Sequence, residues 1–317
     1  MHAFTSVVAG PAAGSRRRFL AAGGALAAWG ALPAAARAQT APALITKAIP
    51  SSGERIPVVG LGTARRYEDA RSEADLAPLR ATLTAFEAGG GRMIDTAPSY
   101  GEAESVVGTL VAQLGIRRGL FLATKVGASG KEAGRAQIER SFQLLRSERI
   151  DLISVHNLRD ADTQLATLRD FKQAGRIRYL GLTTSFDSQY DAFEAAMKRE
   201  TLDFVQMDYA LDNRGAGERL LPLARDRGMA VMINLPFGRG RLLSAVQGRP
   251  LPPWAADFDC HSWPQFFLKY IVSHEAVTVV IPGMARPEYA TDNLGAAQGR
   301  LPDAAARRRM EAYIDAL

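Results

Sequence analysis

The sequence predicts an α/β protein of the (β/α)8 TIM barrel class, on two observations. First, short runs rich in β-branched residues alternate with longer segments whose apolar residues recur every three to four positions, as strands followed by amphipathic helices do. Second, eight such strand candidates fall within about 240 residues, which is the strand count and length of this barrel.

Each expected strand is a short apolar run bounded by polar or turn residues. The eight strands are expected at Val58–Gly62, Arg92–Thr96, Leu120–Val126, Asp151–Asn157, Arg178–Thr184, Phe204–Met207, Ala230–Leu235 and Val277–Ile281. The helical segments are expected at Leu76–Ala88, Ala103–Leu114, Gly134–Arg146, Thr163–Gln173, Gln189–Lys198, Glu218–Arg227 and Trp263–Ser273, with a last helix within Leu301–Leu317. Glycine or a basic residue closes several of them, which favours a helix stop.

A doubly wound Rossmann sheet is the alternative fold for this alternation. Such a sheet carries a G-x-G-x-x-G motif in its first strand–helix turn. Gly60 and Gly62 provide two of the glycines, but Arg65 stands where the third is required. Since no internal repeat or second domain is evident either, we expect a single barrel domain over residues 39–317.

Residues 1–38 have the composition of a targeting peptide. Residues 15–20 read Ser-Arg-Arg-Arg-Phe-Leu, which resembles a twin-arginine export motif, and an Ala/Gly/Leu-rich stretch follows. Ala36, Arg37 and Ala38 fit the small-x-small cleavage pattern. We therefore expect a twin-arginine signal peptide over residues 1–38, the twin-arginine export machinery as a partner, and a periplasmic protein exported in the folded state. An uncleaved leader would instead anchor the chain to the membrane.

The positive charge of the chain lies largely in this leader. The net charge is +6, and the four arginines of residues 1–38 leave +2 for the rest. No nucleic-acid partner is therefore expected, and the run Arg307–Arg309 is interpreted as a solvated helix face. A single cysteine, Cys260, and four histidines exclude a disulfide framework and favour no metal site.

Four ionisable side chains follow successive expected strands at the end where barrel active sites gather. They are Asp95, Tyr100, Lys125 and His156. A nearby ammonium group favours the phenolate and lowers the pKa of a tyrosine, so Lys125 would make Tyr100 a better acid. Asp95 would hold Lys125 charged, and His156 would hydrogen-bond a carbonyl oxygen. This quartet predicts carbonyl reduction, with Tyr100 giving the proton to an oxygen that gains negative charge.

On these residues the sequence resembles the aldo-keto reductase family over roughly Ile56–Ala297. The stretch Ile94–Gly101, with Glu104 and Gly108 after it, is similar to the family's Asp/Tyr signature, and the quartet matches its catalytic tetrad. The resemblance implies an eight-stranded barrel and NADP (NADPH) bound without a Rossmann motif. Together with the leader, the chain resembles the exported branch of the family.

The resemblance also implies a set of cofactor-binding residues. The nicotinamide carboxamide would be held by Asn157, by Thr184 or Ser185, and by Gln206. The loop after the seventh strand would close over the pyrophosphate through Pro236, Gly238, Gly240 and Arg241. Gly283, Arg286 and Asn293 would bind the adenosine end, where Arg286 pairs with the 2′-phosphate and favours NADPH over NADH. Three places depart from the family: residues 182–185 replace the usual Ser-Asn after the fifth strand, Asn234 stands where many members carry a stacking tyrosine, and Tyr289 replaces a common glutamine.

The substrate is specified only as a small-molecule aldehyde or ketone. Arg65, Tyr67, Leu158, Trp254 and Phe258 are candidates for its pocket. Two alternatives to the NADP-dependent aldo-keto reductase remain open. One is a nicotinamide-nucleotide-binding or sensing protein on the same barrel with little turnover. The other is a lyase or aldolase that uses Lys125 as a Schiff-base nucleophile.

Overall fold

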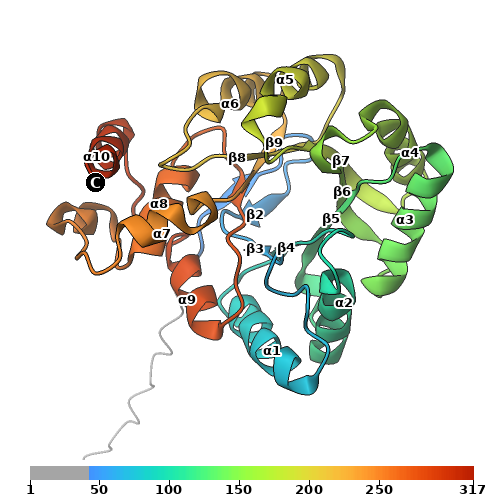
Figure 1. Ribbon diagram of the computed structural model, residues 1–317, viewed down its shortest axis with the longest axis horizontal. Coiled ribbons are helices and arrows are strands. Elements are labelled where there is room, and N and C mark those ends of the chain that lie inside the picture. Colours follow the sequence, from blue (N-terminus) through green and yellow to red (C-terminus); the bar gives the residue numbers. More distant parts are fainter. Residues whose placement is uncertain (1–42) are drawn as a thin grey trace, which may run out of the picture. The chain divides into compact units, whose positions relative to one another are not determined.

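Eight parallel strands form one sheet in the order β10-β9-β8-β7-β6-β5-β4-β3. Two parallel bridges, Val59–Val280 and Gly62–Gly283, join its first and last strands and close it into a barrel. In Figure 1 the helices lie around the outside of these strands. The computed structural model describes residues 43–317, so the expected signal peptide of residues 1–38 lies outside the described part. The predicted (β/α)8 fold is confirmed.

The barrel strands are β3 (Leu61–Gly62), β4 (Met93–Asp95), β5 (Phe121–Val126), β6 (Ile150–Val155), β7 (Ile177–Thr183), β8 (Phe204–Asp208), β9 (Ala230–Asn234) and β10 (Val279–Val280), and an antiparallel hairpin of β1 (Thr46–Ala48) and β2 (Arg55–Pro57) precedes them. The helices are α1 (Glu73–Ala88), α2 (Ala103–Leu114), α3 (Lys131–Leu144), α4 (Ala161–Gln173), α5 (Tyr190–Arg199), α6 (Ala216–Asp226), α7 (Arg241–Ala245), α8 (Trp263–Val272), α9 (Pro287–Gly295) and α10 (Ala304–Asp315). Among residues 43–317, no helix combines the length and apolar character needed to cross a membrane.

Five expected strands end one or two residues earlier than the apolar pattern suggests, and at two of them the backbone gives the reason. Beyond β6, Asn157 and Leu158 have φ values of 51° and 59°, so the chain turns into a short 3-10 helix over His156–Leu158. Beyond β9, Leu235 has φ of 50°. These left-handed residues cannot continue a strand, and each turn brings a polar segment over the barrel mouth.

Helix α1 begins three residues before the expected start because of its cap. The Ser72 hydroxyl accepts a hydrogen bond from the Asp75 backbone N–H at 3.2 Å, and the Asp75 carboxylate accepts one from the Ser72 N–H at 2.9 Å. This reciprocal capping box satisfies two backbone donors that a helix start leaves open. Helices α7 and α9 were not expected from the periodicity, and both are short.

The barrel interior is an apolar layer built from alternate residues of the strands. Phe121, Tyr179 and Phe204 pack there as neighbouring rings, with centroids 5.6 to 5.9 Å apart. The N-terminal hairpin covers this end of the barrel, since Ile49 and Ile56 join the same cluster and the Tyr179 hydroxyl donates to Ser52 Oγ at 2.7 Å.

The same alternation places polar side chains at the other end of the barrel. Side chains of a strand repeat on one face every second residue. The interior residues Met93, Ala123, Phe204 and Met232 are each followed two positions later by a polar residue of their strand. Those residues are Asp95, Lys125, Gln206 and Asn234. Strand pleating alone therefore collects these four groups at the carboxyl ends of the strands.

Candidate active site

The centre of the site is a buried ion pair between neighbouring strands. Lys125 Nζ, on β5, donates to both carboxylate oxygens of Asp95, on β4, at 2.7 and 2.9 Å, and to the Thr96 carbonyl at 2.9 Å. The two side chains are 2% and 5% exposed. The Asp95 and Tyr100 groups outweigh the effect of burial and raise the pKa of Lys125. The ammonium group is therefore held charged inside the barrel.

Tyr100 lies over this ion pair from the loop that follows β4. A turn, in which the Tyr100 N–H donates to the Ala97 carbonyl at 3.0 Å, brings its ring back over the barrel. Lys125 Nζ lies 5.2 Å from the ring centroid. Burial raises the pKa of Tyr100, and Lys125 opposes this without reversing it. Lys125 therefore lowers that pKa as expected, but burial and the Asp95 charge more than offset it, so the pKa lies above its ordinary value.

His156 completes the group from the 3-10 turn after β6. Its ring lies edge-on to Tyr100, with centroids 5.9 Å apart and planes at 83°, and its Nδ1 lies 3.4 Å from Ser99 Oγ. Burial and the Lys125 charge lower the pKa of His156 to about 4, so the ring is neutral at neutral pH. The four residues that the sequence selected thus lie together, with a neutral imidazole, a protonated phenol and an ammonium–carboxylate pair.

The residues expected at the nicotinamide carboxamide also converge. Ser185 Oγ donates to Asn157 Oδ1 at 3.4 Å, whereas the Thr184 hydroxyl donates to Gln189 Oε1 at 2.7 Å. Of the two residues that the sequence left open, Ser185 is therefore the one that lies against Asn157. Gln206 is buried on β8 at the same end of the barrel.

Asn234 leaves an acceptor in this region without a partner. Its Nδ2 donates to the Thr184 carbonyl at 3.1 Å, and its Oδ1 is buried with no hydrogen-bond partner among the described residues. A buried unpaired oxygen is unfavourable. This oxygen and the Asn157–Ser185 pair fit a ligand amide, which offers both a donor and an acceptor.

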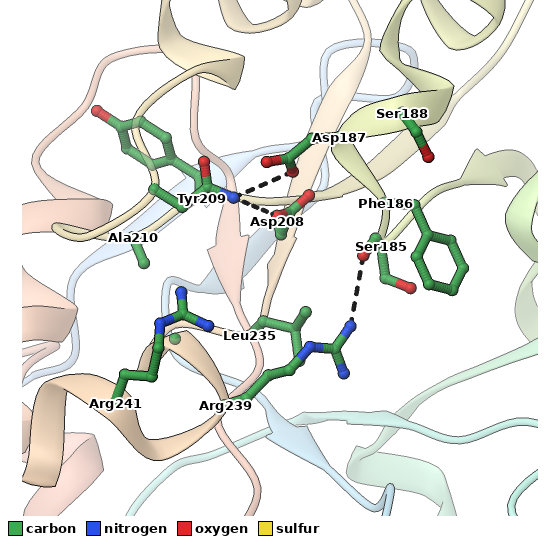
Figure 2. A pocket seen from close by; sticks show the side chains of 12 residues that line it. Ser185, Phe186, Asp187, Ser188, Asp208, Tyr209, Ala210, Leu235, Arg239 and Arg241 are labelled. Atoms are coloured by element: carbon green, nitrogen blue, oxygen red, sulfur yellow. Dashed lines mark hydrogen bonds between the residues drawn. The ribbon is translucent and has the colours of Figure 1, made fainter.

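The loop after β9 forms one wall of a cavity of about 310 Å³, shown in Figure 2. Pro236 is buried, Gly240 has φ of 98°, and Gly238 has φ of 55° in a place where a Cβ would collide with the Asp212 carboxylate. Only glycine suits that place. Arg239 reaches across the cavity in Figure 2, and its Nη2 donates to the Ser185 carbonyl at 3.5 Å.

The expected phosphate ligand Arg241 already has an anionic partner. Its guanidinium pairs with the Asp212 carboxylate at 2.8 and 2.9 Å. Two more carboxylates, Asp187 and Asp208, line the cavity, and burial and Asp187 together raise the pKa of Asp208. None of these three acids was expected from the sequence. One signal was available, since Asp208 follows Gln206 by two positions and so shares its face of β8.

The residues expected at the adenosine end lie on and before α9. Gly283 bridges to Gly62 where the barrel closes. Arg286 precedes α9 and is 65% exposed, with Glu288 3.8 Å away and Tyr289 below its guanidinium at 5.9 Å. Asn293 is only 3% exposed, so its side chain offers almost no surface to a ligand.

The comparison with family models decides the class of protein. The model of the aldo/keto reductase family matches residues 58–314. The chain belongs to this family. The aldo-keto reductase resemblance that rested on the Asp95–Tyr100 signature is thus confirmed.

Three named proteins are similar in sequence to this member of the family. It is 29% identical over 277 residues to the methylglyoxal reductase YeaE of Escherichia coli (strain K12), across 84% of this chain and 95% of that protein. It is 24% identical over 269 residues to an NADH-specific methylglyoxal reductase of the same strain, across 68% and 81%. The 29% identity to the aldo-keto reductase YhdN of Bacillus subtilis (strain 168) extends over 213 residues, 61% of this chain, and the chain spans 62% of the length of that relative.

Solved structures confirm the fold of this protein. An aldo-keto reductase from Klebsiella pneumoniae in complex with NADPH superposes with a TM-score of 0.73 at 24% identity, covering 86% of this chain and 95% of that one. The glycerol dehydrogenase AKR11B4 from Gluconobacter oxydans gives a TM-score of 0.71 at 23% identity, with the same coverage.

A second cavity, of about 570 Å³, opens beside His156. Residues of three loops and of α3 line it: Pro98, Ser99, Gly127, Gln137, Asn157 and Arg159. Gln137 and Arg159 were missed by the sequence analysis, although Arg159 follows His156 by one turn. Within the described residues, no group of three or more His, Cys, Asp or Glu is placed to hold a metal ion.

Most residues expected at the substrate pocket lie elsewhere. Trp254 and Phe258 pack against Phe266 of α8, with ring centroids 5.6 and 6.0 Å from it, as aromatic residues that pack loops would. They belong to an aromatic cluster that packs the segment before α8 against that helix. Arg65 lines a different cavity, and Tyr67 is fully buried with no hydrogen-bond partner for its hydroxyl among the described residues.

Proposed function

We propose that this protein is an NADPH-dependent reductase that converts an aldehyde or ketone to the alcohol, with Tyr100 as the proton donor. The observation that carries the proposal is the placement of the Tyr100 phenol between His156 and the buried Lys125–Asp95 pair. Family membership supports it, and so does the NADPH bound to a structural neighbour. NADPH, when bound, supplies the hydride that adds to the carbonyl carbon.

Each residue of the tetrad has a role that follows from its surroundings. The raised pKa of Tyr100 keeps its hydroxyl protonated at neutral pH, so Oη holds the proton that the carbonyl oxygen needs as it gains negative charge. The Lys125 ammonium stabilises the phenolate left behind. Asp95 keeps that ammonium in place, and the neutral His156 donates from its ring N–H to orient the carbonyl oxygen. In oxidation the Tyr100 phenolate takes the proton back.

The cofactor would be held by the groups that lie around the barrel mouth. Asn157, Ser185, Gln206 and the open Oδ1 of Asn234 suit the carboxamide, and the glycine-rich loop 238–240 allows close approach of a phosphate. Arg286 is the most exposed of the expected ligands, and its guanidinium suits a 2′-phosphate. This residue supports a preference for NADPH, in contrast to the NADH-specific relative.

Substitution of the proton donor tests the mechanism. Tyr100→Phe is expected to lose nearly all turnover of an aldehyde panel while NADPH still binds, as followed by fluorescence titration. Tyr313→Phe, on α10, is the matched control and is expected to keep full turnover. If Tyr100→Phe retained wild-type turnover, the assigned role of Tyr100 would be wrong.

Single-turnover experiments separate the reductase from its alternatives. NADPH that binds tightly but is oxidised by no aldehyde would favour a nucleotide-binding or sensing protein, an alternative suggested by Asn234 in place of the stacking tyrosine. Borohydride trapping of a Lys125 adduct would favour the lyase. For cofactor choice, Arg286→Met is expected to weaken NADPH binding about 10- to 100-fold and leave NADH binding unchanged.

We further propose that residues 1–38 direct export of the folded protein to the periplasm through the twin-arginine machinery. The Ser15–Leu20 motif and the cleavage pattern at 36–38 support this. Folded export would let the chain acquire its dinucleotide in the cytoplasm. Native mass spectrometry of the exported protein tests both points, because it shows whether residues 1–38 are removed and whether a dinucleotide accompanies the chain.

A further inference from the structure

We infer that the substrate carries an anionic group, a carboxylate, close to its reacting carbonyl, and that Arg159 binds this group. The inference rests on the proposed reductase function and names its substrate class. It starts from the composition of the cavity beside His156. Arg159 contributes a full positive charge to the wall of that cavity, and no carboxylate of residues 43–317 lines it.

The Arg159 guanidinium is available for a ligand. Within residues 43–317, no carboxylate lies within 4.0 Å of it, and its one hydrogen bond runs from Nε to Ser129 Oγ at 3.4 Å. The neighbouring acid is Asp160, which accepts from the Gly130 N–H at 2.7 Å and from Gln164 Nε2 at 3.3 Å. Those donors hold the Asp160 carboxylate toward α3 and α4, so Arg159 keeps both Nη groups for a bidentate anion.

Gln137 adds a neutral donor to the same wall. Its Oε1 accepts hydrogen bonds from the Gly127 and Ala128 N–H groups at 2.8 and 3.0 Å. These two bonds fix which end of the amide faces the backbone and leave Nε2 as a donor for the cavity. A carboxylate can accept from a guanidinium and an amide together. The cavity wall therefore offers donors of two kinds and no group that repels an anion.

The position of Arg159 also limits the length of the substrate. The Arg159 N–H donates to the His156 carbonyl at 3.1 Å, so both residues belong to one tight turn. A carbonyl bound by His156 and Tyr100 would thus have its carboxylate within reach of one arginine side chain. The volume of about 570 Å³ suits such a small molecule. These features favour a short oxo acid over a neutral aldehyde of the same length.

A comparison of charged and neutral aldehydes tests the inference. The full chain is assayed with NADPH on glyoxylate, 4-oxobutanoate and 5-oxopentanoate, each beside its methyl ester. For the best acid, Arg159→Met is expected to lower kcat/KM about 10- to 100-fold, mostly through KM, and to leave the esters within about twofold. Arg159→Lys is expected to recover part of the loss. Arg308→Met, an exposed charge on α10, controls for net charge and is expected to change nothing.

The outcomes separate this inference from the proposed function. A wild-type enzyme that reduces acids and esters equally well, or an Arg159→Met variant that loses activity equally on both, overturns the role of Arg159 and leaves the reductase standing. A wild-type enzyme that reduces neither acid nor ester, nor any aldehyde of the panel, overturns the proposed reductase and this inference with it. The preference for acids over esters is also compared at low and high salt. A preference that falls in high salt in the wild type, but not in Arg159→Met, supports the charge interaction.

Discussion

Replacement of Lys125 by methionine would leave Asp95 as a lone carboxylate inside the barrel. The two side chains are 2% and 5% exposed and joined at 2.7 Å, so no water replaces the lost ammonium group. Removal of one partner of such a pair costs about 3 to 5 kcal/mol of unfolding free energy. We expect a loss of this size for Lys125→Met at pH 7, measured by urea denaturation. Asp95→Asn in the same background is expected to recover part of it.

The loss should depend on pH in a defined direction. Burial raises the pKa of Asp95 above its ordinary value of 3.8 even beside Lys125, which lowers it, so loss of Lys125 should raise it further and the folded variant should bind more protons than the unfolded chain. Its stability therefore falls as pH rises from about 3.8 through the raised pKa. In the wild type, the raised pKa of Lys125 keeps that contribution constant until the pH approaches 10.5. A loss below about 1 kcal/mol, or one of equal size at pH 4.5 and pH 7, would refute this reasoning.

Three further predictions follow from single contacts. Gly108→Ala should lower the free energy of unfolding by at least about 1 kcal/mol in urea denaturation, despite the better helix propensity of alanine. The reason is that the added Cβ would collide with the backbone at the end of α3. The control Gly119→Ala, with open space around it, should leave the stability unchanged. His156→Asn should make the loss of stability between pH 6.5 and 4 shallower, because with its pKa lowered to about 4 the folded ring stays neutral in this range while the unfolded chain takes up the proton; acid titration followed by circular dichroism measures it. Asp212→Asn should release Arg241 from its ion pair and lower the Kd for NADPH severalfold in fluorescence titration, and an unchanged or higher Kd would place the phosphates away from Arg241.

The barrel and the tetrad could be predicted because both depend on local patterns. Strand periodicity of two places Asp95 and Lys125 inward above an apolar layer, and the carboxyl ends of parallel strands meet at one mouth. The same rule applied to β8 would have found Asp208 beside Gln206. The alternation of apolar and polar residues does not predict the backbone conformation at Asn157 and Leu235, where left-handed residues end the strands.

Other parts of the site depend on contacts between distant segments, which no local pattern encodes. Arg241 was expected to meet a phosphate, but Asp212, 29 positions earlier, pairs with it. From the sequence, Trp254 and Phe258 could line the substrate pocket or pack a loop, and only the structure shows that Phe266 provides a packing surface for both. Arg159 was overlooked for the opposite reason: its lack of an acidic partner becomes visible only when every neighbouring carboxylate has been located.

The net electrostatics of Tyr100 show why burial has to be known before a mechanism is assigned. From the sequence, Lys125 should make the phenol more acidic before any reaction starts. In the structure, burial raises the pKa of Tyr100 more than Lys125 lowers it, and Asp95 adds to the rise. The ground state is therefore the neutral phenol, which is the form that a proton donor needs. The Lys125 charge then acts mainly after the proton has left, when a buried phenolate without that charge would be most unfavourable. In the proposed mechanism, Lys125 therefore lowers the barrier rather than setting the resting protonation state.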